Sequence, residues 1–403
     1  MTLRLLVVLL LVAAGAAPAQ APSTADTSRQ PQRSARHAFR IVTVVDSVYF
    51  PSALAWLPNG DLLLTERPGR LRVVRDGVLD PTPIAGVPAV WRARGQGGLL
   101  DIALHPDFAR NGLLYLSHGM GREGDSSGTL AVTRARLEGD RLVEAKAIFV
   151  ANAWEGRNNH FGGRLAFDAK GFLYVTVGER MADPNLLAAH PAQDPRRHFG
   201  TVVRLHDDGR VPSDNPFRGR GDTLPEIWSY GHRNPQGIAV DPASGDVWET
   251  EHGPRGGDEL NLIRRGGNYG WPMVTWGVNY DGTPITAESR RAGMESPRFT
   301  WVPSIATAGM TFYTGDRFAW WKGNLFIASL AGQQLVRVTI EDGRVVSTEP
   351  LLQGVVGRMR DVRQGPDGLL YLVLESGYTS TRPSRVVRLE PVESEVKGPI
   401  GRH

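Results

Sequence analysis

A short pattern of hydrophobic and polar positions recurs along the chain from about residue 40 onward. In each copy, a polar turn that contains glycine is followed by a run rich in Leu, Val, Ile, Phe and Tyr. Such a run is typical of a buried β-strand, and the glycine allows the positive φ that a tight hairpin turn requires. No long amphipathic helical pattern interrupts the series. The six copies cover residues 58–64, 111–116, 170–175, 244–248, 322–327 and 367–372.

The spacing of these copies indicates how the hairpins are organised. The turn glycines are residues 60, 112, 171, 245, 323 and 368, so the successive spacings are 52, 59, 74, 78 and 45 residues. The shorter intervals fit a four-stranded blade with its loops, and the longer ones indicate insertions after the third and fourth copies. We predict an all-β, six-bladed β-propeller with four-stranded antiparallel blades. An irregular, turn-rich β-sandwich is the alternative.

In a propeller, loops from every blade converge at one end of the central channel. The inserted loops at 176–240 and 249–312 are therefore expected to build a ligand-binding mouth there. The fold by itself does not define a function, which has to be argued from the residues of that mouth.

The N-terminal residues predict export. Arg4 precedes an apolar run at 5–14, and the small residues after it suit cleavage after Ala19 or Ala21. A membrane anchor is the alternative, but the run is short for a bilayer span. We therefore expect a periplasmic or secreted protein with no stable membrane insertion. The expected regions are a signal peptide at 1–21, a flexible lead-in at 22–38, the propeller at 39–392 and a C-terminal tail at 393–403.

Composition narrows the chemistry that the protein can perform. The 403 residues include 46 Lys and Arg, 42 Asp and Glu and no Cys, and the formal net charge is +4. Disulfides, thiolate metal sites and a cysteine nucleophile are therefore excluded. The small positive excess is spread along the chain without a Lys/Arg run, so we expect no nucleic-acid partner.

Two loop segments carry candidate catalytic side chains. His160 lies within 158–164, just before a predicted strand, where a neutral histidine could accept a proton. A structural histidine that joins two loops is the alternative, and the sequence by itself favours it. Arg233 lies within 229–237 and could bind a carboxylate or polarise a carbonyl oxygen. A surface salt bridge explains Arg233 equally well.

Other segments are candidates for ligand binding. Residues 250–259 combine acidic side chains with glycine-flanked carbonyls, which suit a hard cation such as calcium, although a solvated acidic turn is the alternative. Arg358 and Arg360 stand two residues apart on an extended segment, so both should point the same way, toward a multiply anionic ligand or along a surface face. The loop that contains Gln96 has glycines but no following helix, so we expect it to present the Gln96 amide rather than to bind phosphate.

Together these segments resemble the soluble quinoprotein glucose/sorbosone dehydrogenases, in particular the aldose sugar dehydrogenase branch. The resemblance extends in order from about residue 50 to about residue 389, and its most specific pieces are 231–237 and 253–271. It implies a six-bladed propeller that binds pyrroloquinoline quinone (PQQ) and calcium at the channel mouth. It also implies oxidation of the anomeric hydroxyl of an aldose sugar to a lactone. We further expect an external electron acceptor and a monomer or homodimer.

The resemblance also implies a role for each candidate residue. His160 matches the catalytic base, and Arg233 matches the arginine beside the reactive carbonyl of the cofactor. The protein then needs to supply only a base, positioning and charge, because the cofactor is the electron sink. The other matches are cofactor contacts at Gln96, Asn234, Tyr280, Arg358 and Arg360, calcium-binding carbonyls at Gly253 and Pro254, and a second calcium site at Glu259 and Tyr269.

One position departs from the pattern of the family. Glucose dehydrogenases of the family place a lysine in the loop after the fifth-blade strand, where this chain has Ala331. A long late insertion of those enzymes is also missing, which predicts a more open sugar site. The alternative to an enzyme is a secreted, non-enzymatic propeller that binds carbohydrate or a protein partner. A calcium-dependent lactonase would need converging carboxylates and asparagines, which the His160 and Arg233 segments match poorly.

Overall fold

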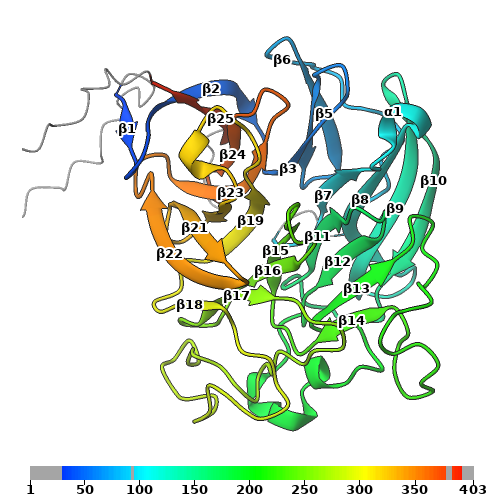
Figure 1. The fold of residues 1–403 in the computed structure, drawn as a ribbon. Helices are drawn as coiled ribbons and strands as arrows, with labels where there is room; N and C mark the ends of the chain where they lie inside the picture. The colour runs from blue at the N-terminus through cyan, green and yellow to red at the C-terminus, as the bar shows by residue number, and fades with distance from the viewer. Residues whose placement is uncertain (1–29, 92–94, 378–383, 393–403) are drawn as a thin grey trace, which may run out of the picture.

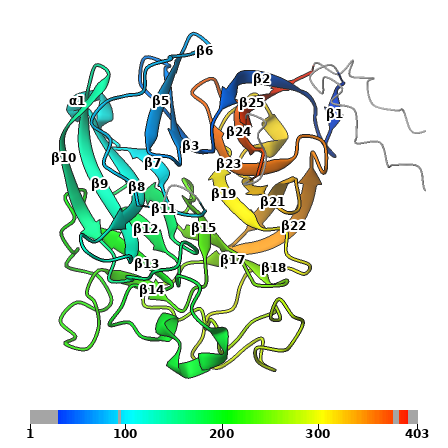
Figure 2. The same cartoon turned by 180° about the vertical axis from the view of Figure 1, so that it is seen from behind.

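Six antiparallel sheets surround a central channel in the computed structural model. The structure describes residues 30–91, 95–377 and 384–392. The innermost strands of successive sheets contact one another, and the sixth contacts the first, so the ring is closed. Figures 1 and 2 show this arrangement from opposite sides. The predicted all-β, six-bladed propeller with four-stranded blades is confirmed, whereas the predicted signal peptide and C-terminal tail lie outside the described residues.

Five blades consist of four strands that follow one another in the sequence. From the innermost strand outward, the first blade has β3 (Pro51–Trp56), β4 (Leu62–Glu66), β5 (Arg70–Arg75) and β6 (Val78–Leu79), and the second has β7 (Leu99–Leu104), β8 (Leu113–Gly121), β9 (Gly128–Glu138) and β10 (Arg141–Val150). The third has β11 (Gly162–Phe167), β12 (Leu173–Val177), β13 (Thr201–Leu205) and β14 (Ile227–Tyr230). The fourth has β15 (Pro235–Val240), β16 (Val247–Glu251), β17 (Asp258–Leu262) and β18 (Phe299–Trp301). The fifth has β19 (Thr307–Phe312), β20 (Leu325–Ser329), β21 (Leu335–Glu341) and β22 (Arg344–Leu351).

The sixth blade combines both ends of the described chain. Residues Phe39 to Val48 of its β2 pair with Pro391 to Ser384 of β25, so distant parts of the sequence close the ring. The short β1 lies inside the segment that we expected to be a flexible lead-in, so regular structure begins before residue 39. From the innermost strand outward, this blade has β23 (Arg358–Gln364), β24 (Leu370–Glu375), β25 (Ser384–Pro391), β2 (Ala38–Val48) and β1 (Gln32–Arg33).

Each repeated turn joins the innermost strand of a blade to its second strand. The six turn glycines all have positive φ, from 65° at Gly112 to 94° at Gly60, as the sequence pattern predicts. The innermost strands are also irregular near their first residues, because the pairing register shifts there in every blade. A β-bulge bends a strand and redirects its side chains. The six bulges therefore shape one end of the channel.

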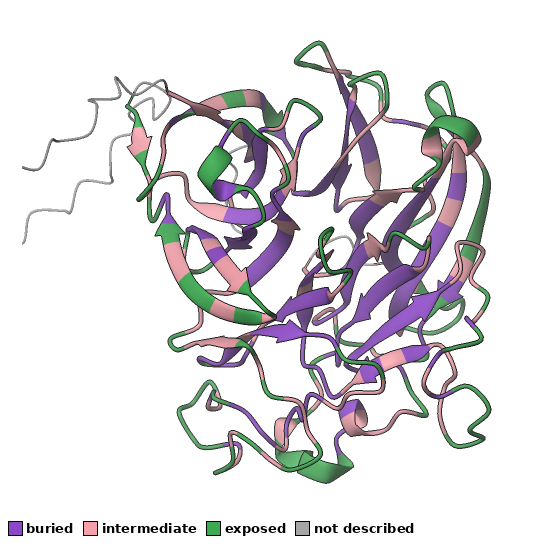
Figure 3. Cartoon of the chain, viewed as in Figure 1, coloured by how far each residue is buried: buried purple, intermediate pink, exposed green. Residues whose placement is uncertain are grey.

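Hydrophobic side chains fill the spaces between neighbouring blades. Leu63 and Val73 of the first blade pack with Ile102 and Leu116 of the second, and similar clusters join the other blades. Figure 3 shows the buried residues concentrated in the strands and the exposed ones in the outer connections. Burying one such side chain contributes roughly 1.5–3 kcal/mol. The blades thus form a rigid support for the loops at either end of the channel.

The insertions predicted after the third and fourth repeats are long connections. Residues 178–200 join β12 to β13, and residues 263–298 join β17 to β18; both lie along the lower edge of Figure 1. In the described ranges, no helix is long and apolar enough to cross a membrane. The described helices are α1 (Phe108–Asn111) and the 3-10 helices at Pro184–Ala189, Pro191–Gln193 and Ala319–Trp321.

A cavity lies at each end of the channel. The first, which we call the polar mouth, has a volume of about 120 Å³ and lies at the bulged end of the innermost strands. The second, which we call the apolar end, has a volume of about 380 Å³ and is lined by later residues of the same strands, such as Ala103, Ala166 and Phe167. The two ends therefore use the same strands but different side chains.

Candidate active site

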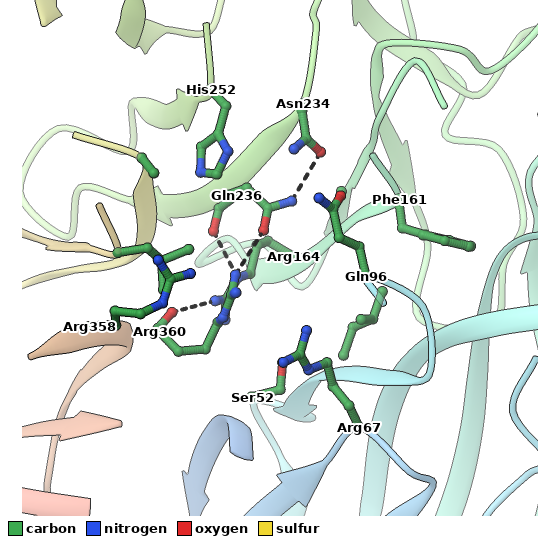
Figure 4. A pocket seen from close by; sticks show the side chains of 14 residues that line it. Ser52, Arg67, Gln96, Phe161, Arg164, Asn234, Gln236, His252, Arg358 and Arg360 are labelled. Atoms are coloured by element: carbon green, nitrogen blue, oxygen red, sulfur yellow. Dashed lines mark hydrogen bonds between the residues drawn. The ribbon is translucent and has the colours of Figure 1, made fainter. Parts of the chain in front are cut away.

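All six blades contribute to the polar mouth (Figure 4). Four of the fourteen residues in its lining are arginines, and none of the fourteen is acidic, so the cavity suits an anionic ligand. The lining comprises Ser52, Arg67, Gln96, Leu100, Phe161, Gly162, Arg164, Asn234, Gln236, His252, Ala306, Leu330, Arg358 and Arg360.

A buried ion network forms the floor of the polar mouth. The Arg164 guanidinium lies 3.3 Å from an Asp361 oxygen and donates to the carbonyl oxygen of Arg360 at 2.8 Å. Arg363 donates to Asp101 at 2.8 Å and to Asp361 at 2.9 Å. Two arginines balance two aspartates, so this network is neutral overall. It separates the polar mouth from the apolar end.

His160 directly precedes Phe161 of the mouth lining, and its ring is fixed. Its backbone has a φ of 48°, which is uncommon for a residue with a side chain, and its N–H donates to Gln96 Oε1 at 2.7 Å. The ring Nδ1 lies 2.5 Å from Glu179 Oε1, and the other Glu179 oxygen accepts from the Ala182 N–H at 2.6 Å. Glu179 therefore holds the proton of His160 on Nδ1 and leaves Nε2 as the basic atom.

The electrostatic surroundings keep this histidine neutral. Burial and the positive charge of Arg233 lower the pKa of His160 below its ordinary value of 6.5, and they outweigh the opposing effect of Glu179. Burial by itself would raise the pKa of Glu179, but the hydrogen bond from His160 and the charge of Arg233 help to lower it overall. The pair is thus a neutral imidazole beside a carboxylate, which is the state that a general base requires near pH 7.

Arg233 lies beside this pair, between the polar mouth and a more open cavity. Its carbonyl oxygen accepts the Glu179 N–H at 2.8 Å, which ties the two predicted catalytic segments together. Its Nη1 donates to the carbonyl oxygens of His252 at 3.0 Å and Gly253 at 2.8 Å, so the guanidinium is firmly held. Its Nη2 lies 3.4 Å from the hydroxyl of Tyr280, whose side chain is largely exposed at the rim.

Three arginines converge on one buried carboxylate across the mouth. Arg358 contacts Glu375 at 3.0 Å, Arg360 at 2.9 Å and Arg67 at 3.4 Å. Burial would raise the pKa of Glu375, but Arg360 and Arg67 outweigh it and lower this pKa to about 2. One carboxylate cannot neutralise three guanidinium groups. The cluster therefore keeps a positive surplus that faces the cavity.

The two predicted amide contacts also lie in this lining. Gln96 accepts from the backbone of His160, and Asn234 Oδ1 accepts from Gln236 Nε2 at 3.1 Å. Ala331, where the resemblance expects a lysine, is exposed and follows Leu330 of the lining. The cations that the structure does place around the mouth come from the first, third, fourth and sixth blades.

The predicted metal carbonyls lie beside Arg233 on the side of the open cavity. Pro254 lines this cavity of about 350 Å³ together with Arg233 and Tyr280. The backbone of Gly253 is fixed at both polar atoms, because its N–H donates to Asp258 at 2.9 Å and its oxygen accepts from Arg233. The two residues therefore form a rigid turn at the rim of the site.

Glu259 belongs to a buried acidic cluster behind that turn. Asn261 Nδ2 donates to Glu249 and to Glu251 at 3.1 Å each, and it lies 3.4 Å from Glu259. Burial and the charge of Glu251 raise the pKa of both Glu249 and Glu259 well above the usual range. Among the described residues, Glu249 Oε1 and Asn261 Oδ1 have no hydrogen-bond partner. This cluster is stable only with bound protons or a bound cation.

Tyr269 lies next to the same cluster, but its hydroxyl is already engaged. It donates to the Leu262 carbonyl oxygen at 2.7 Å and accepts from the Arg264 N–H at 2.8 Å. The ring stacks on His232 with a centroid distance of 4.4 Å. Only the backbone carbonyl of Tyr269 could therefore take part in cation binding.

The structure thus brings most of the predicted site residues to one place. Gln96, Asn234 and the Arg358/Arg360 pair line the polar mouth, and His160 is hydrogen-bonded to Gln96 beside it. Arg233, Tyr280 and Pro254 line the open cavity, and Glu259 and Tyr269 line a small cavity that also borders Arg233. Several residues of the site were not predicted from the sequence, and four of them lie at the ends of second strands. These four are Arg67, Glu179, His252 and Glu375, each of which ends or follows the second strand of its blade.

The fold and site define a class of protein. It is a propeller with a neutral, carboxylate-supported histidine next to a cationic pocket at one end of its channel. A model of the glucose/sorbosone dehydrogenase family matches residues 48–381. The chain belongs to this family, and it is an oxidoreductase, as the resemblance implies.

Named relatives of the chain support its assignment to this family. An aldose sugar dehydrogenase, YliI, of Escherichia coli (strain K12) is 43% identical over 335 residues, which cover 82% of this chain and 88% of the relative. Quinoprotein glucose dehydrogenase B of Acinetobacter calcoaceticus is 27% identical over 407 residues, which cover 82% and 84%. The structure of the PQQ-bound form of an aldose sugar dehydrogenase from Streptomyces coelicolor superposes with a TM-score of 0.71 at 28% identity, covering 88% of this chain and 98% of that one.

Proposed function

We propose that this protein oxidises the anomeric hydroxyl of aldose sugars to the lactone with PQQ as its cofactor. The observation that carries the proposal is the position of His160. Its ring is held by Glu179 at 2.5 Å, its pKa is lowered by burial and the charge of Arg233, and its backbone is hydrogen-bonded to Gln96 of the arginine-lined cavity. A base and an electrophilic guanidinium next to an anion pocket are what such an oxidation requires from the protein.

The polar mouth fits a flat polycarboxylate. The surplus charge of the three arginines around Glu375 matches the carboxylates of PQQ, and a relative of the family has been solved in its PQQ-bound form. Arg358, Arg360, Arg233, Gln96 and Asn234 would hold the cofactor, with Tyr280 at its outer edge. When bound, PQQ supplies the electron sink for the sugar oxidation.

The side chains of this chain then have definite tasks. His160 Nε2 takes the proton of the anomeric hydroxyl, while Glu179 keeps the ring oriented and stabilises the imidazolium that forms. Arg233 stabilises negative charge that develops beside it, because its guanidinium is held by two carbonyl oxygens and cannot turn away. A positioned base of this kind contributes about 10²–10⁴-fold in rate.

Calcium fits two places in the fold. The carbonyl oxygens of Gly253 and Pro254 would bind a cation at the cofactor edge. Glu259 and the carbonyl of Tyr269 would bind a second one beside Glu249 and Glu251, where unpartnered carboxylate oxygen is found among the described residues. Oxygen ligands with several carboxylates are the set that calcium prefers.

The cellular setting of the protein follows from its expected export. We propose that it acts in the periplasm or outside the cell, as a monomer or homodimer, and passes electrons to an external acceptor. The non-enzymatic alternative has no observation in its favour, because the side chains of the mouth are arranged for chemistry as well as for binding.

Reconstitution tests the proposal directly. Purified apoprotein is mixed with PQQ and calcium, and the quinone absorption band and dye-linked oxidation of an aldose panel are recorded. We expect both signals, with turnover abolished in His160→Ala while the absorption band is retained. The exposed variant Glu144→Gln serves as a control and should oxidise aldoses at the wild-type rate. Loss of both signals in the wild-type protein would refute the proposal.

A further inference from the structure

The His252 side chain points into the polar mouth and has no part in the proposed oxidation step (Figure 4). His252 directly follows β16, and its backbone N–H donates to the Asn234 carbonyl oxygen at 3.2 Å. Its ring Nε2 lies 2.5 Å from the carbonyl oxygen of Thr307. A carbonyl oxygen can only accept, so Nε2 carries the proton of this contact.

The other ring nitrogen faces a cavity that is rich in donors. Arg67, Arg164, Arg358 and Arg360 present only N–H groups to a ligand. The described residues provide no hydrogen-bond partner for Nδ1 of His252. Because Nε2 carries the ring proton in its contact with Thr307, Nδ1 is left as a bare acceptor.

The amide oxygens of the lining are already in use. Gln96 Oε1 accepts from the His160 N–H at 2.7 Å, and Asn234 Oδ1 accepts from Gln236 at 3.1 Å. Gln236 Oε1 accepts from Arg360 at 3.3 Å. Each of these oxygens already accepts one hydrogen bond, whereas Nδ1 of His252 accepts none from the described residues, so Nδ1 is the acceptor most available to an N–H of the ligand.

We infer that His252 Nδ1 accepts a hydrogen bond from a ring N–H of the bound cofactor. The inference rests on the proposed function, because PQQ combines the carboxylates that the arginines suit with one pyrrole N–H. The two kinds of contact select for different features of one molecule. The arginines recognise negative charge, whereas His252 recognises the orientation of the ring system and excludes polyanions that lack such a donor.

Equilibrium binding tests this role without relying on turnover. The probes are PQQ and its derivative methylated at the pyrrole nitrogen, titrated into calcium-loaded apoprotein while tryptophan fluorescence is followed. We expect the wild-type protein to bind PQQ about tenfold more tightly than the methylated compound, as the loss of one buried hydrogen bond predicts. His252→Leu should bind PQQ about tenfold more weakly and lose the preference.

Two further variants separate this role from a structural one. His252→Asn keeps an acceptor oxygen close to the position of Nδ1, and we expect it to retain the preference for PQQ even if His252→Leu does not fold. His118→Leu removes another buried histidine, which bonds Thr133 and the Gly119 carbonyl oxygen in the second blade, and should leave the preference unchanged.

Equal binding of both probes by the wild-type protein would overturn the inference and leave the proposed function standing. Failure of the wild-type protein to bind PQQ would overturn both.

Discussion

The two ends of the channel are built by the same six strands and yet have opposite character. At the polar mouth, the lining includes Arg67, Arg358 and Arg360. At the apolar end, the strands contribute apolar residues with a small residue between them, as in Leu54-Ala55-Trp56, Ile102-Ala103-Leu104 and Leu165-Ala166-Phe167. Only Thr311, Arg363 and Gln364 are polar there. Regular strands build the apolar end, and bulged strands with converging loops build the mouth.

The difference shows where the chemistry of this fold comes from. Most side chains at the apolar end are hydrophobic and need only fit their neighbours, whereas polar contacts there come from Thr311, Arg363 and Gln364. Side chains at the mouth are held by partners from other blades, as when Arg67 of the first blade meets Glu375 of the sixth and Gln96 of the second meets His160 of the third. Such contacts depend on the ring being closed. The active site is therefore a property of the whole propeller and of no single blade.

The contrast between the two ends predicts its largest effect on activity at Glu179, which holds the proposed base His160. Glu179→Gln should lower kcat/KM for aldoses roughly 10³-fold, because the amide no longer holds the proton of His160 on Nδ1. Steady-state kinetics of the reconstituted protein measures this loss, and the quinone absorption band checks that the cofactor is still bound. A loss of less than tenfold would mean that Glu179 does not position the ring.

The ion network between the two ends should matter for stability. Arg164→Leu leaves Asp361 and Asp101 buried with one cation fewer, so we expect the free energy of unfolding to fall by about 3–5 kcal/mol. Denaturant titration measures the change. The partly exposed control Arg136→Leu should cost less than about 1 kcal/mol. Equal stability of the two variants would show that the network does not support the channel.

The pH dependence of activity reports on the base. His160 must be neutral to accept a proton, and its pKa lies below 6.5. We therefore expect the acidic limb of kcat/KM, where His160 becomes protonated, to be centred below pH 6.5. In Glu179→Gln the acidic limb should move lower still, because the charge that raises this pKa is gone. An acidic limb centred above 6.5 would contradict the neutral pair.

The smallest effect is expected at the apolar end. Ala103→Val places a larger side chain in the cavity at the apolar end, which the ion network separates from the site. We therefore expect kcat/KM to change by less than about twofold and the free energy of unfolding by about 0.5 kcal/mol or less. The same kinetics and denaturant titration measure both. A tenfold loss of activity with unchanged stability would show that the two ends are coupled. It would contradict the conclusion that only the polar mouth serves the chemistry.

Parts of the site could have been found from the aligned repeats. The second strands of the first, fourth and sixth blades end at Glu66, Glu251 and Glu375. Arg67, His252 and Glu179 come just after the second strands of the first, fourth and third blades. Polar residues at the end of an otherwise buried strand are a signal, because they must leave the hydrophobic layer at the channel mouth. What the repeats could not indicate is which of these residues pair with each other, since the partners are separated by up to 308 positions in the sequence.

The sequence by itself determined the repeated hairpins, their number and the identity of the residues that could act as base and cations. These follow from local rules, because a turn glycine, a strand and its side-chain types depend on neighbours in the chain. The tertiary structure decided which residues act together. It placed Glu179 behind His160, joined three arginines to Glu375 and turned His252 into the mouth, since burial and electrostatic coupling depend on distances across the ring that no local pattern contains.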